Sequence, residues 1–270
     1  MAVSNMFYAF LFDRHKTANV RLLASREIRA RIVGTYLGFG HYLLLPLLLI
    51  LIYSFVFTTI FSVRWGASNA NFGSFALRVF IGLIAFNFFA EVVNRSPGLV
   101  LDNATYVKKV LFPLETLVPI AVVVALFSAL ITFIVFLAAY IWAYGLPPRT
   151  VFWLGALWPP LTLLTTGLAW GLAALGVFLR DLRQLVSIFT SALMFLAPVF
   201  YPMSMVPAPY DSLVLLNPLS WLIESIRAAT FDDSSPDILV LICYYVGTFV
   251  FAQFGYWGFM RARKAFADVI

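Results

Sequence analysis

The sequence predicts an all-α membrane protein with six transmembrane helices, an N-terminal interfacial helix, and short re-entrant or interfacial helices between the fifth and sixth spans. Composition is the first observation: 63% of the 270 residues are hydrophobic and 11% are charged, with a mean hydropathy of +0.95. Soluble domains are about 45 to 50% apolar and about 25% charged. The second observation is a series of long stretches without charged residues, since a membrane-crossing helix needs about 20 apolar residues.

Five charge-free stretches predict five of the spans. They lie between Arg31 and Arg64, Glu115 and Arg149, Arg149 and Arg180, Arg183 and Asp211, and Asp237 and Arg261. A sixth span contains Arg78 and Glu91 near its two ends, where long charged side chains extend toward lipid headgroups. We expect the spans at 37–61, 74–94, 116–145, 150–179, 184–200 and 238–260, within a single transmembrane domain over 1–270.

Lysine and arginine divide unevenly between the two sides of these spans. With a cytoplasmic N-terminus, 14 of the 18 lie inside, and only Arg64, Arg78, Arg149 and Arg227 lie outside. Positive charge favours the cytoplasmic side, and an even number of spans returns the chain to the side where it began. Both termini are therefore predicted to be cytoplasmic, and the net charge of +6 indicates topology and contact with membrane lipid, not nucleic acid.

The segments outside the spans have their own patterns. Residues 13–35 are basic, with Val20, Leu23, Ala24 and Ile28 at helical offsets, which predicts an interfacial helix at the inner surface. The inner connection over 95–114 is long enough for a short helix.

The outer region over 201–236 is rich in proline and predicts a second interfacial or re-entrant helix. Asn217 before Pro218 is typical of a helix start, with a capping side chain and proline at the first position. The apolar residues that follow repeat at helical spacing, and Glu224 and Arg227 form an i,i+3 pair on another face.

The sequence contains no signature of catalysis. Its two histidines, His15 and His41, are isolated, and H-E-x-x-H, G-x-S-x-G and the G-x-x-x-x-G-K-[ST] phosphate loop are all absent. One cysteine, Cys243, excludes a disulfide within the chain. No internal repeat is evident, which disfavours an inverted-repeat transporter. The chain is therefore predicted to be neither an enzyme nor a metal-binding protein, and any ATP-driven function requires another subunit.

Two sequence patches follow one another along the chain. The first runs from Asn103 to Glu115 (NATYVKKVLFPLE) and continues with Val118-Pro119. The second combines Phe178-Leu179-Arg180-Asp181, Ala197-Pro198-Val199-Phe200-Tyr201-Pro202 and Leu216-Asn217-Pro218-Leu219-Ser220. Together, and in this order, they resemble the permeases of type-2 ABC exporters that transport O-antigen, capsule and teichoic acid. Leu114-Glu115 departs from the family pattern, where a basic residue is expected.

The resemblance implies partners and a location. It implies a homodimeric permease of the bacterial cytoplasmic membrane, two separate ATPase subunits that bind ATP and Mg, and an undecaprenyl-linked polysaccharide as the substrate, with O-antigen preferred. The permease itself would hold no cofactor. Teichoic acid, capsule or drug export stays open, as does a polytopic membrane transferase, and a channel or carrier working without ATP is a further alternative.

The resemblance also implies a coupling segment at the ATPase. The residues are Asp102, Asn103, Tyr106, Lys108 and Lys109, with a second, smaller contact at Arg180 and Asp181. On charge alone, the two lysines could equally mark the cytoplasmic side of the membrane without contacting an ATPase. Arg180 and Asp181 could equally form an ion pair at the membrane interface.

A path and an outer gate complete the predicted site. Candidate path residues are Tyr42, Tyr53, Phe57, Asn87 and Glu91, since polar groups within a span favour contact with protein or water; most aromatic side chains in membrane proteins face lipid instead. The gate residues are predicted to be Pro198, Tyr201, Pro202, Asn217, Pro218, Glu224 and Arg227.

Overall fold

The computed structural model of this chain describes residues 14–33, 39–56, 74–107, 112–179 and 181–269. The described residues form helices and connecting turns, without a β-strand among them. The longer helices are α2 (Arg14–Val33), α3 (Phe39–Ser54), α4 (Ser74–Arg95), α6 (Leu117–Tyr144), α7 (Leu154–Phe178), α8 (Leu182–Leu196), α10 (Pro218–Phe231) and α11 (Ile238–Ala262). The shorter ones are η2 (Ser96–Gly98), η3 (Leu101–Asn103), α5 (Ala104–Val107), η4 (Leu114–Thr116), η5 (Arg149–Trp153), η6 (Met203–Met205), α9 (Asp211–Leu216), η7 (Arg263–Ala265) and α12 (Phe266–Val269).

Among the described residues, four helices are long and apolar enough to cross a membrane. They are Phe75–Gly98, Leu114–Tyr144, Arg149–Phe178 and Ile238–Ala265, at four of the six expected positions. At the other two positions lie shorter helices, α3 with 16 residues and α8 with 15. At 1.5 Å per residue these extend about 24 and about 22 Å, less than the roughly 30 Å of a bilayer core.

The boundaries of α8 differ from the span expected at 184–200. At its C-terminal end α8 stops because Ala197 adopts an extended conformation, with φ −87° and ψ 146°. A residue that precedes proline is sterically driven out of the helical region, and Pro198 follows. Helix α3 ends at Ser54, and residues 57–61 of the expected span lie outside the described part of the chain.

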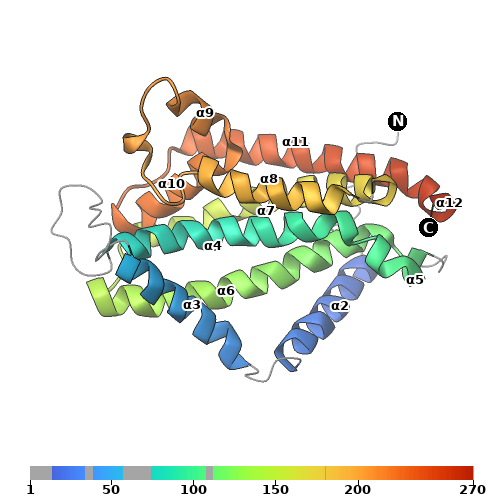
Figure 1. The fold of residues 1–270 in the computed structure, drawn as a ribbon, viewed down its shortest axis with the longest axis horizontal. Coiled ribbons are helices and arrows are strands. Elements are labelled where there is room, and N and C mark those ends of the chain that lie inside the picture. Colours follow the sequence, from blue (N-terminus) through green and yellow to red (C-terminus); the bar gives the residue numbers. More distant parts are fainter. Residues whose placement is uncertain (1–13, 34–38, 57–73, 108–111, 180, 270) are drawn as a thin grey trace.

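Five helices, α4, α6, α7, α8 and α11, run along the long axis of the molecule, while α2 and α3 lean away on one side (Figure 1). Helices α9 and α10 lie at one end, and α5 and α12 lie at the other. We refer to these as the α10 end and the α5 end.

Helix α4 forms the core of the bundle. Phe80 stacks on Phe136 of α6 with ring centroids 6.5 Å apart, and Phe88 meets Trp158 of α7 edge-on at 5.4 Å. Nearly all of its apolar side chains are buried, because α4 contacts α6, α7, α8 and α10 on different sides. A helix that is apolar around most of its circumference is typical of such a central position.

Helices α7 and α11 pack closely through glycine. A Cβ atom on Gly255 would lie 2.1 Å from the carbonyl oxygen of Gly167, and one on Gly167 would lie 2.8 Å from the Cα of Ala252. Small residues allow helix backbones to approach in membranes. Gly171, one turn after Gly167, has no atom within 4 Å of its Cβ position, so it takes no part in this contact.

The apolar face expected on α2 packs against the protein. Ala24 is buried against Ile120 and Val124 of α6, with Val20, Leu23 and Ile28 partly buried around them. The face therefore attaches α2 to the bundle.

Helix α10 begins as the sequence predicts. The side-chain oxygen of Asn217 accepts a hydrogen bond from the backbone N–H of Leu219 at 3.0 Å, and Pro218 occupies the first turn. Its apolar residues Leu222, Ile223 and Ile226 are at most 1% exposed and contribute to the main core. This face therefore packs inside the protein and holds α10 against α4 and α7.

Candidate functional site

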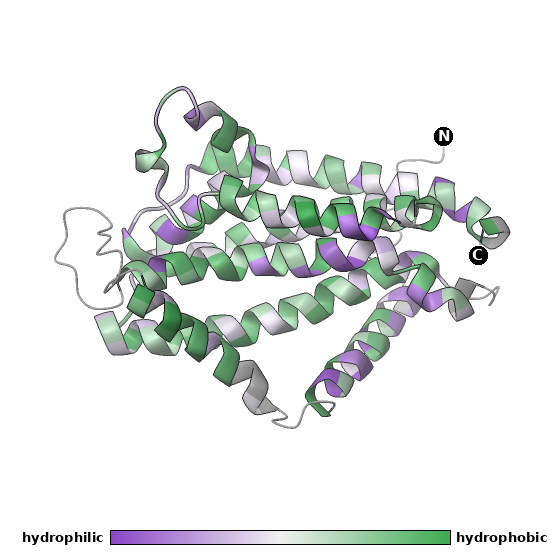
Figure 2. Ribbon diagram, viewed as in Figure 1, coloured by the Kyte–Doolittle hydropathy of each residue, from purple (hydrophilic) through white to green (hydrophobic). Residues whose placement is uncertain are grey.

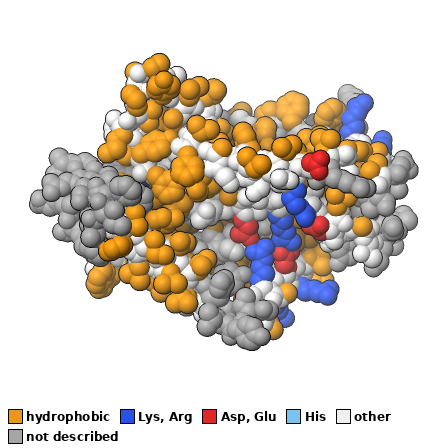
Figure 3. Space-filling view, viewed as in Figure 1, with side chains coloured by type: hydrophobic (Ala, Val, Ile, Leu, Met, Phe, Trp, Pro, Cys, Tyr) orange, Lys and Arg blue, Asp and Glu red, His pale blue; other side chains and the backbone are white. Residues whose placement is uncertain are grey.

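Charged side chains gather in the half of the molecule that carries α2 and the α5 end. Figure 2 shows hydrophilic residues along α2 and at that end of α4, and Figure 3 shows Lys, Arg, Asp and Glu side chains close together on this face. The remainder of the described surface in that view is largely hydrophobic. The candidate site lies among these charges.

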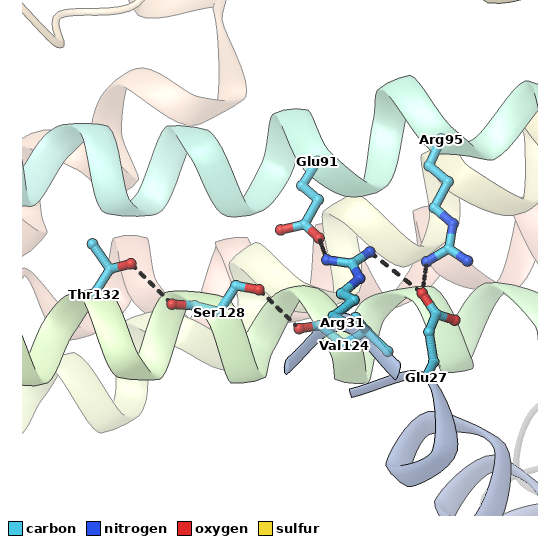
Figure 4. A network of polar contacts seen from close by, with 7 residues as sticks. All are labelled: Glu27, Arg31, Glu91, Arg95, Val124, Ser128 and Thr132. Atoms are coloured by element: carbon cyan, nitrogen blue, oxygen red, sulfur yellow. Dashed lines mark hydrogen bonds and ion pairs between the residues drawn. The ribbon is translucent and has the colours of Figure 1, made fainter. Parts of the chain in front are cut away.

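Four residues of alternating charge connect α2 to α4, and we call them the charge ladder (Figure 4). Arg31 donates from Nη1 to Glu91 Oε1 at 2.5 Å and from Nη2 to Glu27 Oε1 at 3.3 Å. Arg95 Nη1 donates to the same Glu27 oxygen at 2.5 Å. The four side chains are 25 to 33% exposed, so water screens these pairs less than fully exposed ones.

A cavity of about 340 Å³ lies beside the ladder, between α3, α4 and α6. Its polar lining consists of Arg31, Asn87, Glu91, Ser128 and Thr132. The two hydroxyls donate within their own helix, Ser128 to Val124 O at 3.3 Å and Thr132 to Ser128 O at 2.9 Å, which leaves their oxygens able to accept from a ligand. The structure thus brings two expected path residues, Asn87 and Glu91, into one cavity that we call the α3–α4–α6 cavity.

The aromatic path residues are placed elsewhere or are not described. Tyr53 meets Phe200 edge-on with ring centroids 6.4 Å apart, and Phe200 stacks on Phe195 at 5.8 Å. Tyr53 therefore lies beside the segment that follows α8. The side chain of Tyr42 and the whole of Phe57 are outside the described residues.

The expected coupling segment leaves the end of α4 through two 3-10 turns that pack tightly. A Cβ atom on Gly176 of α7 would lie 2.0 Å from Pro97 O, and one on Gly98 would overlap the guanidinium of Arg183. Arg183 Nη2 also donates to Asp102 Oδ2 at 2.5 Å. The start of the segment is thus held against α7 and α8.

Some of the expected coupling residues lie in the described part of the chain, and others lie outside it. Asp102 and Asp181 are exposed, and Asn103 donates from Nδ2 to Leu99 O at 2.9 Å. The side chain of Tyr106, together with Lys108, Lys109 and Arg180, lies outside the described residues. From the sequence, Arg183 is predicted only to lie on the cytoplasmic side of the membrane. Its pairing with Asp102, 81 residues earlier, had no local signal.

Glu115, the residue that departs from the family pattern, is 2% exposed and joins three parts of the chain. It pairs with Lys16 of α2 at 2.9 Å and with Arg263 of η7 at 2.6 Å. Its backbone oxygen accepts from Trp170 Nε1 of α7 at 3.2 Å. An acidic residue is needed here because two cations from distant segments converge on it.

At the α10 end, Arg227 is the corresponding centre, and it is 1% exposed. Its guanidinium donates to Arg78 O at 3.2 Å, Pro198 O at 2.8 Å and Val199 O at 3.0 Å, and to Glu224 Oε2 at 2.6 Å. Burial lowers the pKa of Arg227 to about 10. This value is still well above neutral pH, so the guanidinium stays protonated. Burial also raises the pKa of Glu224, opposed by the charge of Arg227.

The remaining gate residues surround this centre or lie on the same connection. Pro198 supplies one acceptor for Arg227, and Tyr201 donates from its hydroxyl to Phe195 O at 3.0 Å. Pro202 is buried, while Asn217 and Pro218 begin α10. Arg78, which the sequence placed only as a membrane-edge charge, also pairs with Asp232 at 2.8 Å and lies 4.7 Å above the ring of Phe231.

Within the described part of the chain, no group of three or more His, Cys, Asp or Glu residues is placed to hold a metal ion. The polar residues instead form ion pairs and a cavity lining.

Comparison with known proteins places the chain among exporters. Residues 19–231 match the profile of the ABC-2 type transporter family. The O-antigen export system permease protein RfbA of Myxococcus xanthus is 29% identical, over 92% of this chain and 94% of that protein. An RfbA of Klebsiella pneumoniae is 23% identical over 92% and 93%, and the polysialic acid transport protein KpsM of Escherichia coli is 28% identical over 78% and 80%.

Proposed function

Because this chain belongs to the ABC-2 type transporter family, we propose that it is the permease of an exporter that moves lipid-linked polysaccharide across the bacterial cytoplasmic membrane. Membership makes it a non-catalytic, multi-pass membrane subunit and implies separate ATPase subunits. ATP and Mg are then bound by the ATPases.

The observation that carries the substrate class is the extent of the similarity. Relatives named for O-antigen export align over 92% of this chain, and the family match over residues 19–231 includes the segments that form the α3–α4–α6 cavity and the α10 end. Hydroxyl and amide groups in that cavity suit a polyhydroxylated chain, because they donate and accept hydrogen bonds without demanding one sugar. O-antigen is the preferred substrate.

A capsular polysaccharide is the second candidate. The observation that favours it is the relative named for polysialic acid transport, which aligns over 78% of this chain. Loss of surface O-antigen on deletion supports the first candidate, and loss of capsule supports the second.

We place both termini in the cytoplasm, with α3 and α8 completing six spans. The pairing of Lys16 and Arg263 with one carboxylate brings the beginning of α2 and the end of α11 together at the α5 end. The charge distribution then favours this end as cytoplasmic. Alkaline phosphatase fused to either terminus should be inactive, and an active fusion at one terminus would contradict the topology.

We further propose a homodimer with two ATPases beneath it. The outward face of α8 carries Leu185, Ile188 and Phe189, all more than 60% exposed, which is the apolar surface that a second copy would cover in the membrane. A pair of cysteines introduced at Ile188 in the two copies should cross-link. Failure to cross-link along this face would show that α8 does not form the contact between the two copies.

In the proposed cycle, the ATPase engages Asp102 to Lys109, with Arg180 and Asp181 as a second contact, and Arg227 and its neighbours act as the outer gate. The packing of η2 against α7 and α8 supports this role, since a displacement of the segment moves both helices.

The proposed function is tested by co-expression with a candidate ATPase. The two subunits should co-purify, and deletion of the permease should trap undecaprenyl-linked glycan inside the cell. Surface glycan that is independent of the ATPase would overturn the proposal, and transferase activity of the purified chain would favour a membrane enzyme.

A further inference from the structure

The charge ladder separates two cavities. On one side is the α3–α4–α6 cavity of about 340 Å³, whose lining includes Arg31 and Glu91. On the other side is a cavity of about 240 Å³ between α2, η3 and α6, whose lining includes Arg26, Glu27 and Arg95, with Asn103 and five apolar residues. The two cavities have no lining residue in common, and Glu27 pairs with one arginine from each lining.

Glu27 occupies a position that fits a phosphate oxygen. Its Oε1 accepts from Arg31 Nη2 and from Arg95 Nη1, so two guanidinium groups from different helices converge on one anionic oxygen (Figure 4). Guanidinium groups match carboxylate and phosphate geometry equally well. An anionic ligand that displaced Glu27 would find both donors already directed toward it.

The balance of charge around this position indicates how much negative charge the ligand carries. The charged groups that line the two cavities are Arg26, Arg31 and Arg95 with Glu27 and Glu91. When Glu27 turns away, three cations face one anion, and the remaining charge of +2 matches the two negative charges of a diphosphate diester. A single phosphodiester carries only one.

From this geometry we infer that Arg31 and Arg95 form a binding site for the diphosphate group of a lipid-linked substrate, which Glu27 occupies as an internal anion when no substrate is bound. Displacement of Glu27 opens the ladder and joins the two cavities. The identity of the ligand rests on the proposed export function, whereas the paired arginines and the charge balance do not.

The position of the ladder suits a lipid-borne headgroup. Helix α2 contacts α6 through the face at Ala24, and the α3–α4–α6 cavity is bounded by the apolar residues Leu45 and Pro46 of α3. A lipid diphosphate therefore reaches the arginines while its chain stays beside apolar helices. Inorganic diphosphate has the same charged group but lacks this second contact.

The test measures binding of tritiated farnesyl-diphospho-N-acetylglucosamine, a diphosphate diester, to the full-length chain in phosphatidylcholine nanodiscs. Glu27→Gln removes the competing charge and should raise the affinity about tenfold, while Arg31→Gln and Arg95→Gln should each lower it about tenfold, as expected for loss of a charge-assisted hydrogen bond. Farnesol should not compete, and inorganic diphosphate should compete only weakly.

Arg263→Gln is the matched control. Arg263 also pairs with a carboxylate and is 31% exposed, against 32% for Arg31 and 33% for Arg95, but it lines neither cavity. The affinity of this variant for farnesyl-diphospho-N-acetylglucosamine should stay within about twofold of the parent chain. If a single arginine variant fails to fold, E27Q/R31Q removes one charge of each sign and should bind more weakly than E27Q.

Equal affinity in the parent chain and all variants would overturn the inference, as would weaker binding by Glu27→Gln, which indicates a purely structural ladder. Binding that depends on the arginines in a chain that exports no glycan would leave the site in place and refute the proposed function. Unchanged glycan export by the folded Arg31→Gln and Arg95→Gln variants would refute the site and leave the proposed function intact.

Discussion

At the scale of single residues, Arg227 shows how a buried charge holds an interhelical junction together. One guanidinium satisfies three backbone carbonyls and a carboxylate from the beginning of α4, the segment after α8, and α10. Gly82 makes room for it, since a Cβ atom there would lie 3.1 Å from Arg227 Nη2. The junction therefore depends on the shape of arginine as well as on its charge.

Replacement of Arg227 by glutamine should destabilise the chain strongly. It leaves the carbonyls of Arg78, Pro198 and Val199 without their donor and Glu224 without its cation, and removal of one partner from a buried charge pair costs about 3 to 5 kcal/mol. Thermal unfolding in detergent measures the loss. Arg149→Gln, at an exposed arginine, is the control and should be nearly neutral; equal unfolding temperatures for the two variants would contradict the role of Arg227.

Glu115 is a second buried charged residue that connects distant parts of the chain. Glu115→Gln keeps the side-chain volume but removes the charge that Lys16 and Arg263 share, so we expect a loss of about 2 kcal/mol. Hydrogen exchange should accelerate in both 14–33 and 263–269. Asp181→Asn, at an exposed acid, should change neither segment, and exchange confined to one segment in Glu115→Gln would show that the carboxylate does not join the two.

At the scale of elements, the contact between α7 and α11 depends on the absence of side chains. Gly255→Ala places a methyl group against the backbone of Gly167 and should cost about 1 to 3 kcal/mol by overpacking. Gly258→Ala on the same helix has open space within 4 Å and should gain slightly from helix propensity. Unfolding temperatures of the two variants should move in opposite directions, and a shift of the same sign would refute the close contact.

Local features of these elements were predictable from the sequence, whereas their pairings were not. The cap of α10 involves Asn217 and a residue two positions away, and the long spans follow from charge-free runs. The ladder joins Arg31 to Glu91 across 60 residues, and Glu115 meets Arg263 across 148. Contacts between residues so far apart in the sequence are set by the packing of the helices, which the periodicity of a single helix does not encode.

The end of α8 and the surface that α2 covers were not predicted from the sequence, for two different reasons. A hydropathy run continues through Ala197 because alanine and proline carry no charge, yet the steric rule for residues before proline ends the helix there. The face of α2 was identified correctly as apolar, but the sequence alone did not distinguish a membrane surface from α6 as the surface it covers.

At the scale of the whole molecule, α4 connects the two ends. Near its beginning Arg78 O accepts from Arg227, and near its end Glu91 and Arg95 belong to the charge ladder and continue into η2. A displacement of the segment after α4 therefore reaches the ladder and the α10 end through one continuous helix. We expect ATPase docking on that segment to act on both.

The docking expectation is tested by Lys108→Glu with Lys109→Glu, two lysines whose side chains lie outside the described residues. Charge reversal should weaken co-purification with the ATPase by about tenfold, about 1.4 kcal/mol, and reduce ATP-dependent glycan export. Arg261→Glu with Lys264→Glu makes the same change in net charge at exposed positions of the same end, and should retain association. Unchanged association in both double variants would leave Lys108 and Lys109 as markers of the cytoplasmic side. Equal loss in both would indicate that the ATPase responds to the charge of the whole α5 end and not to the segment.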